Sequence, residues 1–326
     1  MRAMLVRQPG GPEQLHVADV PDPGPPGDGE VIVDVAAAGV NRADLLQRRG
    51  LYPPPPGASD ILGLEVSGAI SAVGRGVDGW RVGEGVCALL AGGGYAERVA
   101  VPAAQLLAAP AGLDPVHAAA IPEAFITAHD ALSTRGRLSA GETVLIHGGG
   151  GGVGTAAVQL AARLGATVIV TAGSDRKLAA CRQLGATFGI NYRTDDFVAE
   201  AHRHTADRGA DVILDVIGAS YLERNLTALA LDGRLVAIGL QGGATGSIDL
   251  GFLLRRRVAV IGTSLRGRAA TQKAEIVARV AREVLPGFAD GSLRVVIDRV
   301  LPMERAAEAH SLVEDGSLVG KVLLRM

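Results

Sequence analysis

The central part of the chain alternates short hydrophobic runs with longer stretches of helical periodicity. Runs of aliphatic and β-branched residues bounded by glycine or charge are typical of strands buried on both faces. Six runs have this pattern: 143–147, 167–171, 186–190, 211–216, 234–239 and 258–263. Amphipathic stretches such as 153–164 separate them. This order predicts an α/β domain over residues 123–266, built on a doubly wound parallel sheet with crossover helices.

The flanking segments have a different pattern. Residues 1–122 contain many short Val- and Ala-rich runs broken by Gly, Pro and Asp, which indicates a β-rich domain. Residues 267–326 predict, in order, a helix, a strand, a second helix and a last strand, over 269–283, 293–297, 303–314 and 319–324. We expect this tail to return to the first segment. Residues 1–122 and 267–326 would then form one discontinuous domain with the α/β domain inserted into it.

A glycine-rich turn joins the first predicted strand of the α/β domain to its first helix. Five consecutive glycines, Gly148 to Gly152, are followed by Val153 and Gly154. Gly149, Gly151 and Gly154 have the G-x-G-x-x-G spacing of dinucleotide-binding turns. Glycine lets the backbone approach a pyrophosphate, and the first helical turn offers N–H groups and a positive dipole end. The βαβ context therefore predicts a dinucleotide cofactor.

The end of the second predicted strand selects the dinucleotide. NAD sites usually carry an acid there for the ribose 2′-hydroxyl. This chain has uncharged Ala172 and Gly173, followed by Ser174, a helix-start acid and the cations Arg176 and Lys177. A hydroxyl and an ammonium bind a 2′-phosphate through charge-assisted hydrogen bonds. Only three of the 32 basic residues are lysine, and one of them stands at this position. The pattern predicts NADPH.

Composition excludes several classes of protein. The 326 residues are 48% hydrophobic with a net charge of −2, which gives no electrostatic footprint for nucleic acid or an anionic membrane. The two cysteines, Cys87 and Cys181, are too few for a disulfide framework or a structural zinc lobe. Arg7 interrupts the N-terminal apolar run, and no run approaches the length of a membrane span. We expect a cytoplasmic protein whose partner is a small molecule.

The motifs along the whole chain resemble one family. They are Pro9-Gly-Gly-Pro-Glu13, Asn41-Arg-Ala-Asp-Leu45, Pro54-Pro-Pro-Pro-Gly-Ala58, Ile61-Leu-Gly-Leu-Glu65, Ala120-Ile-Pro-Glu-Ala124, Asn191-Tyr192 and Gly320-Lys-Val-Leu-Leu324. The chain resembles the zinc-independent quinone oxidoreductase (zeta-crystallin-like) branch of the medium-chain dehydrogenases/reductases, and within it the stress-induced quinone oxidoreductase subgroup. The resemblance implies a Rossmann domain, a discontinuous GroES-like catalytic domain and a homodimer joined through the edge strand at 258–261.

The resemblance also bears on zinc. In zinc-using relatives a cysteine stands where this chain has Asn41, and a histidine stands where it has Leu64. Glu123 lies near the third ligand position and carries a carboxylate, but a leucine cannot replace an imidazole. We therefore expect no metal, and without that Lewis acid alcohol oxidation is disfavoured.

The resemblance implies a set of cofactor contacts. Residues matching Asn41, Tyr52 and Thr127 lie near the nicotinamide in the family, and those matching Ser174, Lys177 and Tyr192 hold the 2′-phosphate. The remaining expected contacts follow strand ends or match the family's cofactor site: Gly151, Gly152, Val153, Gly154, Gly173, Ile217, Gly218, Gly239, Leu240, Thr263, Ser264, Leu265 and Lys321. The unbroken glycines of the turn replace a polar residue of the relatives, so backbone groups would carry the pyrophosphate.

The expected reaction is hydride transfer from NADPH to a quinone, which needs neither a metal nor a strong acid. Asn41 and Tyr52 are the candidate hydrogen-bond donors to the acceptor, and Asp44 is expected to orient a neighbouring group. One alternative is reduction of activated C=C bonds in enones, 2-alkenals or enoyl thioesters, which makes a proton donor more important. Another is a non-catalytic NADPH-binding sensor.

Overall fold

The structure is a computed structural model that describes residues 1–326 as two compact units. Unit 1 comprises Met1–Ile126 and Leu265–Met326, and unit 2 comprises Thr127–Ser264. The sequence analysis placed the two boundaries at 122/123 and 266/267. Helix α3 (Pro122–His129) crosses the first boundary without interruption, so no break in the sequence pattern marks it.

Unit 2 is built on a six-stranded parallel sheet in the order β10-β9-β8-β11-β12-β13. Its elements are η3 (Asp130–Arg135, a π-helical turn), β8 (Thr143–His147), α4 (Gly152–Leu164), β9 (Thr167–Ala172), α5 (Asp175–Gln183), β10 (Phe188–Asn191), α6 (Phe197–His204), β11 (Ala210–Asp215), η4 (Ala219–Tyr221), α7 (Leu222–Ala228), β12 (Leu229–Ala237), α8 (Leu250–Arg256) and β13 (Ala259–Gly262). The strand order reverses direction between β8 and β11, as in doubly wound folds. The predicted fold class and all six predicted strands are confirmed.

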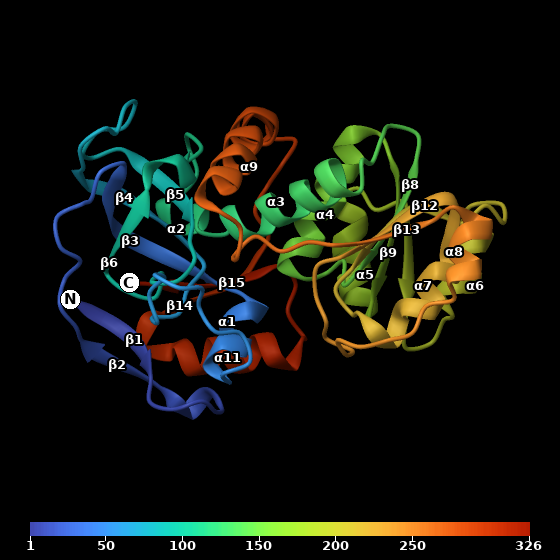
Figure 1. The fold of residues 1–326 in the computed structure, drawn as a ribbon, viewed down its shortest axis with the longest axis horizontal. Helices are drawn as coiled ribbons and strands as arrows, with labels where there is room; N and C mark the ends of the chain where they lie inside the picture. The colour runs from blue at the N-terminus through green and yellow to red at the C-terminus, as the bar shows by residue number, and fades with distance from the viewer. The chain divides into compact units, whose positions relative to one another are not determined.

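Helices cover both faces of this sheet. Figure 1 shows α4 and α5 on one side of the strands and α6, α7 and α8 on the other. Alternate strand residues such as Leu145 and Ile213 pack with Phe197 and Leu226 from the second helix layer into one buried cluster. Such strands face apolar helices on both sides, which explains their continuous hydrophobic runs in the sequence.

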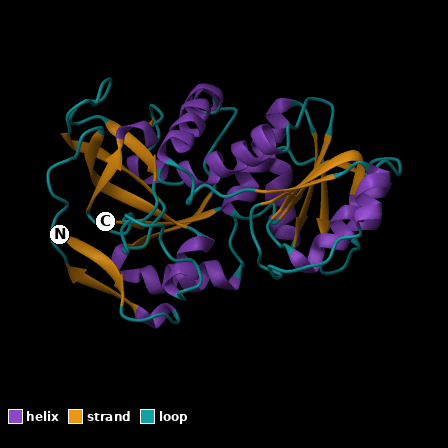
Figure 2. Cartoon of the chain, viewed as in Figure 1, coloured by secondary structure: helices purple, strands orange, loops and turns teal.

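Unit 1 combines two sheets with short helices. Its elements are β1 (Arg2–Val6), η1 (Pro12–Gln14), β2 (Leu15–Asp19), β3 (Glu30–Val40), α1 (Arg42–Arg48), β4 (Glu65–Val73), β5 (Gly85–Leu89), β6 (Arg98–Pro102), η2 (Ala103–Gln105), β7 (Leu106–Ala108), α2 (Pro115–Ala118), α9 (Ala270–Glu283), α10 (Leu285–Ala289), β14 (Ile297–Pro302), η5 (Met303–Arg305), α11 (Ala306–Asp315) and β15 (Lys321–Arg325). Figure 2 shows these strands and helices by type.

The larger sheet of unit 1 joins the two segments of the chain. Its order is β14-β15-β3-β4-β5-β7, with β6 also paired to β3. Strand β15 lies antiparallel to β3, so that Val322 faces Val40. The buried cluster on this sheet includes Val33 and Val66 from the first segment and Leu301 and Leu324 from the second. The C-terminal segment therefore completes the sheet of the N-terminal segment, as the sequence analysis expected.

One predicted strand of unit 1 was misplaced. Residues 293–297 do not form a strand, because the Leu293 N–H donates to the carbonyl of Gly287 in the turn after α10. The pairing begins instead at Ile297, opposite Lys321, and runs to Pro302. The charged pair Asp298-Arg299 makes the second segment look less like a strand, and only the pairing with β15 reveals it.

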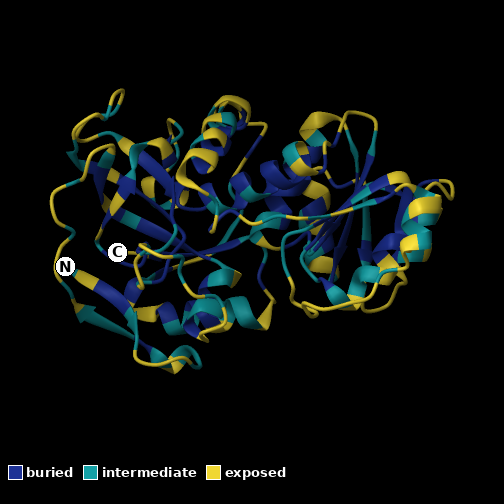
Figure 3. Cartoon of the chain, in the orientation of Figure 1, coloured by how far each residue is buried: buried dark blue, intermediate teal, exposed yellow.

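Burial follows this architecture. Figure 3 shows the strands mostly buried, whereas α8 has only half-buried and exposed residues. On α8 the side chains of Leu250 and Leu254 are 69% and 79% exposed. None of the helices is both long enough and apolar enough to span a bilayer.

Candidate functional site

The predicted cofactor residues of unit 2 gather at one edge of its sheet. Because all six strands are parallel, the turns after their carboxyl ends lie on the same side. Residues 151–154 follow β8, residues 173–177 follow β9, and Tyr192 follows β10. Residues 217–218 follow β11, residues 239–240 follow β12, and residues 263–264 follow β13. This edge includes the switch point between β8 and β11, where doubly wound sheets bind their ligands.

The glycine turn after β8 leaves no room for a side chain at Gly154 and little room at Gly150. A Cβ on Gly154 would lie 2.2 Å from the carbonyl oxygen of Gly148, and one on Gly150 would lie 3.0 Å from the side chain of Lys177. Gly151 is the N-cap of α4, with φ of −82° and no side chain to bond the first helical N–H groups. Those N–H groups and the helix dipole form a cradle that fits a pyrophosphate.

The three residues predicted for the 2′-phosphate lie on the turns after β9 and β10 and on the first turn of α5. The Tyr192 hydroxyl lies 2.6 Å from the place that a Gly173 Cβ would take, so glycine is needed there. Ser174 is the N-cap of α5, but its hydroxyl does not bond the helix. Lys177 lies in the first part of α5, with its stem over Gly150. Asp175 is the first residue of α5, as expected for a helix-start acid.

Sequence reasoning missed two residues at this edge. The Arg193 guanidinium lies 3.2 Å from the same virtual Cβ of Gly173 and adds a second cation. Asp215, at the end of β11, accepts hydrogen bonds from the N–H groups of Ile217 (2.8 Å) and Gly218 (2.9 Å). It thereby fixes a predicted contact turn. Arg193 directly follows Tyr192 in the sequence, so it could have been found. Asp215 appeared only as part of a strand.

Four further predicted contacts differ from one another in their surroundings. Thr263 donates from its hydroxyl to Asp130 Oδ2 at 3.0 Å, so this hydroxyl is already engaged within unit 2. Thr127 is half-buried on α3, and Leu240 is 58% exposed. Leu265 is buried in unit 1 rather than in unit 2.

In unit 1, the ammonium of Lys321 is held by three oxygen atoms. Its Nζ lies 2.6 Å from Glu65 Oε1, 2.6 Å from Asn41 Oδ1 and 3.2 Å from the Val40 carbonyl oxygen. Lys321 is 5% exposed and Glu65 is fully buried. An ammonium has three N–H donors. All three are therefore directed at groups within unit 1, and the cofactor contact expected for Lys321 stays a prediction.

Asn41 is engaged on both sides of its amide. Its Nδ2 donates to Glu65 Oε1 at 2.9 Å and to the Gly39 carbonyl at 3.3 Å, while Oδ1 accepts from Lys321. Gly39 is required for this arrangement, since a Cβ there would lie 2.1 Å from Glu65 Oε1. Asn41 would have to release one of these partners to donate to an acceptor, so its predicted catalytic role stays a prediction.

Asp44 ends a chain of buried hydrogen bonds. Its carboxylate accepts from the N–H groups of Asn41 (2.7 Å) and Gly63 (3.2 Å) and from the Tyr95 hydroxyl at 3.2 Å. His310 Nε2 lies 3.2 Å from that hydroxyl, and Arg48 donates to His310 Nδ1 at 3.1 Å. Burial lowers the pKa of His310 to about 3, so the neutral ring donates from Nε2 to Tyr95. Asp44 thus holds the turns at 41 and 63, in agreement with an orienting role.

Beside this cluster lie three polar groups with no hydrogen bond or ion pair in the structure. They are the Tyr52 hydroxyl, the Glu123 carboxyl and the Lys273 ammonium. Burial and then the neighbouring carboxylate of Glu65 raise the pKa of Glu123 to about 8, and Lys321 opposes this shift. Glu123 is at the start of α3, where its backbone N–H donates to Glu65 Oε2 at 2.8 Å. Lys273 was not predicted, because α9 appeared only as a helix.

Arg266 holds the Tyr52 loop. It donates to the carbonyls of Ala91 (2.8 Å) and Tyr52 (3.0 Å) and to Gln47 Oε1 at 2.6 Å. Its guanidinium carbon also lies 5.0 Å from the centre of the Tyr52 ring. The ring is therefore fixed by a cation–π contact while its hydroxyl stays unbonded.

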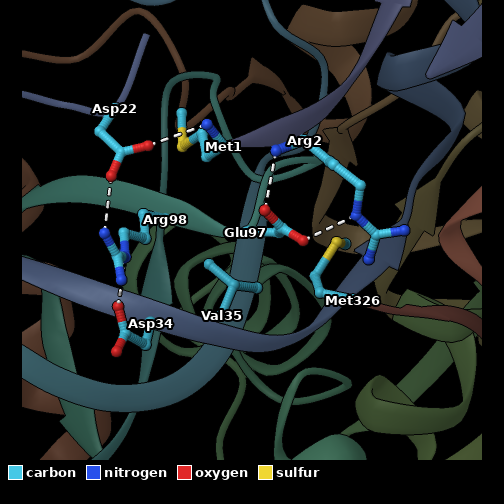
Figure 4. Close-up of a pocket in the computed structure, with 8 residues that line it drawn as sticks. All are labelled: Met1, Arg2, Asp22, Asp34, Val35, Glu97, Arg98 and Met326. Atoms are coloured by element: carbon cyan, nitrogen blue, oxygen red, sulfur yellow. Dashed lines mark hydrogen bonds and ion pairs between the residues drawn. The ribbon is translucent and has the colours of Figure 1, made fainter. Parts of the chain in front are cut away.

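A hollow on the surface of unit 1 offers no comparable chemistry. It is lined by Met1, Arg2, Asp22, Asp34, Val35, Glu97, Arg98 and Met326 (Figure 4). Its charges are paired with one another: Arg98 with Asp22 (2.6 Å) and Asp34 (3.0 Å), and Arg2 with Glu97 (2.8 Å). No predicted site residue lies among them.

The fold and these sites define a class of protein, and two family models match it. The alcohol dehydrogenase GroES-like domain matches residues 27–111, and the zinc-binding dehydrogenase domain matches residues 152–281. The human quinone oxidoreductase is 32% identical over 327 residues, covering 99% of this chain and 97% of the relative. The chain belongs to the medium-chain dehydrogenase/reductase family, in its quinone oxidoreductase branch. The resemblance seen in the sequence is confirmed at this level.

A second kind of relative is much longer. A phenolphthiocerol/phthiocerol polyketide synthase subunit of Mycobacterium tuberculosis is 33% identical over 325 residues. The match covers 98% of this chain, but the chain spans only 14% of the length of that synthase.

Three solved structures have the same fold over their whole length. The quinone oxidoreductase of Escherichia coli, complexed with NADPH, is 30% identical, with a TM-score of 0.90 and 100% of both chains covered. An NAD-dependent alcohol dehydrogenase is 35% identical, with a TM-score of 0.89 and 100% of both chains covered. The CurK enoyl reductase is 30% identical, with a TM-score of 0.88, covering 100% of this chain and 99% of that one.

Proposed function

We propose that this protein is an NADPH-dependent oxidoreductase that reduces quinones. The main observation in favour of NADPH is the set of residues at the end of β9. Uncharged Ala172 and Gly173 stand where NAD sites usually have an acid. The Tyr192 hydroxyl lies against Gly173, Ser174 follows it as the N-cap of α5, and Lys177 lies in the first turn of that helix. The similarity to the Escherichia coli quinone oxidoreductase complexed with NADPH supports this choice. Because an NAD-dependent alcohol dehydrogenase is also similar, the preference between NADPH and NADH should be measured. When bound, NADPH supplies a hydride.

Zinc does not fit the residues of unit 1. Leu64 is 2% exposed and has no donor atom. The carboxylate of Glu65 and the amide of Asn41 already hold the Lys321 ammonium, so a divalent cation at those oxygens would lie against a buried positive charge. We therefore propose that the reaction proceeds without a metal.

The protein's own contribution is to hold the acceptor and donate to its oxygen. Tyr52 is the candidate donor that no internal group occupies, and Arg266 fixes its ring. Asp44 positions the turns at 41 and 63 rather than touching the acceptor. Orientation of this kind lowers the barrier without a covalent intermediate.

One experiment tests acceptor, cofactor and metal together. Loss of NADPH absorbance is followed with 1,2-naphthoquinone, trans-2-nonenal and crotonyl-CoA in parallel, before and after treatment with a chelator. We expect turnover with the quinone, a lower rate with NADH, and no change on chelation. Stoichiometric zinc together with activity lost on chelation would contradict metal independence. No turnover with any acceptor would favour the non-catalytic NADPH-binding sensor.

The second candidate function is reduction of activated C=C bonds. Two observations favour it: the similarity to the CurK enoyl reductase, and the presence of a protonatable carboxyl at Glu123 beside Tyr52. Such a reaction must protonate the product, so it uses a donor more than quinone reduction does. Faster turnover of trans-2-nonenal or crotonyl-CoA than of the quinone would support this candidate.

We also propose a homodimer joined through β13. This strand is the edge of the unit 2 sheet and pairs only with β12. Val260 on β13 is 40% exposed, so the edge is apolar and open. An unprotected apolar edge strand is a template for pairing with a second chain.

A further inference from the structure

Three hydrogen-bonding groups of unit 1 have no internal partner and act on one another electrostatically. The negative charge of Glu123 affects the pKa values of both Tyr52 and Lys273. Lys273 is only 5% exposed, yet its ammonium forms no hydrogen bond or ion pair in the structure. The ammonium itself is only partly shielded from water, and partial desolvation of a charge without a partner still costs some free energy. The cost is offset when an anionic oxygen binds beside it.

The choice of lysine at this place is itself informative. The chain has three lysines among its 32 basic residues, and two of them, Lys273 and Lys321, are 5% exposed and lie around Glu123. Arginine stays charged in proteins, whereas a buried lysine changes its pKa readily. Desolvation lowers the pKa of Lys273, and Glu123 opposes this effect. Lys273 therefore stands where its protonation can respond to a bound group.

The surroundings of Glu123 keep its proton in place at neutral pH. Burial is the first cause of the raised pKa of about 8, and the carboxylates of Glu65 on β4 and Asp44 on α1 raise it further. Lys321 on β15 and Lys273 on α9 act in the opposite direction. Below about pH 8 the group is a carboxylic acid, which donates its proton. Tyr52 and the Arg266 that fixes it face the same carboxyl.

We propose that Glu123 is the proton donor to the reduced acceptor, and that Lys273 and Tyr52 bind the acceptor oxygen beside it. This proposal rests on the proposed reductase function. The hydride and its two electrons come from NADPH and leave a negative charge on the oxygen of a hydroquinone anion or an enolate. The O–H bond of the Glu123 carboxyl breaks as an O–H bond forms on that oxygen, and water then returns a proton to the carboxylate. The acceptor class is a conjugated carbonyl compound.

The first test separates proton transfer from hydrogen bonding. Glu123→Gln keeps a hydrogen-bond donor and removes the acid. We expect kcat for 1,2-naphthoquinone and trans-2-nonenal to fall about a hundredfold with an unchanged Kd for NADPH. Wild-type kcat/KM should decline as pH rises past about 8, where Glu123 ionises, and this decline should be absent in the variant. Glu275→Gln, on the exposed face of α9, is the control, and Tyr52→Phe should cost less than tenfold.

The second test needs neither cofactor nor turnover. 4-Nitrophenol changes its absorbance when it ionises, so it reports whether the site stabilises a phenolate oxygen. Wild-type protein should lower the apparent pKa of bound 4-nitrophenol, Glu123→Gln should retain this effect, and Lys273→Met should lose it. The melting temperature of each variant shows that it is folded.

The outcomes distinguish the two levels of the proposal. If wild-type protein oxidises NADPH with either acceptor but Glu123→Gln keeps its rate and pH profile, the donor assignment is wrong and the reductase function stands. If wild-type protein turns over no acceptor, the reductase function fails, whatever the probe shows. Binding of 4-nitrophenol with no shift in its ionisation, equal in wild type and Lys273→Met, would overturn the oxygen-binding site.

Discussion

At the scale of single residues, all three lysines of the chain lie at the candidate sites. Lys177 lies over the glycine turn of unit 2. Lys273 and Lys321 lie near Glu123 in unit 1. The surface ion pairs use arginine, as between Arg257 and Asp232 or Arg75 and Asp28. The compact ammonium groups thus stand at the places where we propose that a ligand binds or a proton is transferred.

Substitution of Lys177 should separate the two nicotinamide cofactors. Lys177→Ala removes a charged hydrogen bond worth about 1.5–3 kcal/mol, so KM for NADPH should rise roughly tenfold or more while KM for NADH changes little. Arg176→Ala is a matched control, because Arg176 is the adjacent, exposed cation on α5. Steady-state kinetics with both cofactors make the comparison. Equal effects of Lys177→Ala on the two KM values would contradict the 2′-phosphate assignment.

The sequence could predict residues that act through local pattern but not those that act through distant contacts. Ser174 and Lys177 follow a strand tip, so their place at the sheet edge follows from the parallel order of strands. The engagement of Asn41 with Glu65 and Lys321 joins residues far apart in the chain. Nothing near position 41 in the sequence indicates that Glu65 and Lys321 are its partners.

At the scale of elements, the junction of β8 and α4 depends on glycines with different physical roles. Gly154 is enclosed by the backbone of Gly148 and Gly149. Gly151 has its nearest neighbour 3.5 Å away, and its φ of −82° suits any residue. One glycine is therefore needed for the turn itself, and the other is open toward a ligand.

Two alanine variants test this difference. Gly154→Ala places a Cβ against backbone atoms that cannot move aside cheaply, and such overpacking costs about 1–3 kcal/mol, so the melting temperature should fall by several degrees. Gly151→Ala should leave the melting temperature unchanged and weaken NADPH binding at least tenfold, because its methyl group occupies the approach to the pyrophosphate. Calorimetry and fluorescence titration measure the two effects. Unchanged NADPH affinity in Gly151→Ala would place the phosphates elsewhere.

Elements of unit 2 were easier to predict than those of unit 1. Buried parallel strands carry continuous apolar runs, and β8 begins and ends where the pattern placed it. In unit 1 the mixed stretch 293–301 offers two positions for a strand, and the pairing of Ile297 with Lys321 decides between them. That pairing depends on β15, which the local pattern does not contain.

At the scale of the whole molecule, the open edge at β13 predicts assembly into dimers. Val260→Lys places a charge on this apolar edge and should convert a dimer into monomers, as seen by light scattering at micromolar concentration. Val300→Lys is the matched control, because Val300 is 37% exposed on β14, the edge strand of the other large sheet. Wild-type protein that is already monomeric would contradict the proposed interface.

The pairing of β15 with β3 has a consequence for biosynthesis. Strand β3 is made early, but its neighbour at residues 321–325 emerges from the ribosome only after all of unit 2 has been translated. Unit 2 is a single continuous segment, so it can fold while the sheet of unit 1 still lacks two strands. The nascent chain thus carries an unfinished β-sheet edge from the synthesis of β3 until β15 has emerged, and this sheet is completed only after unit 2.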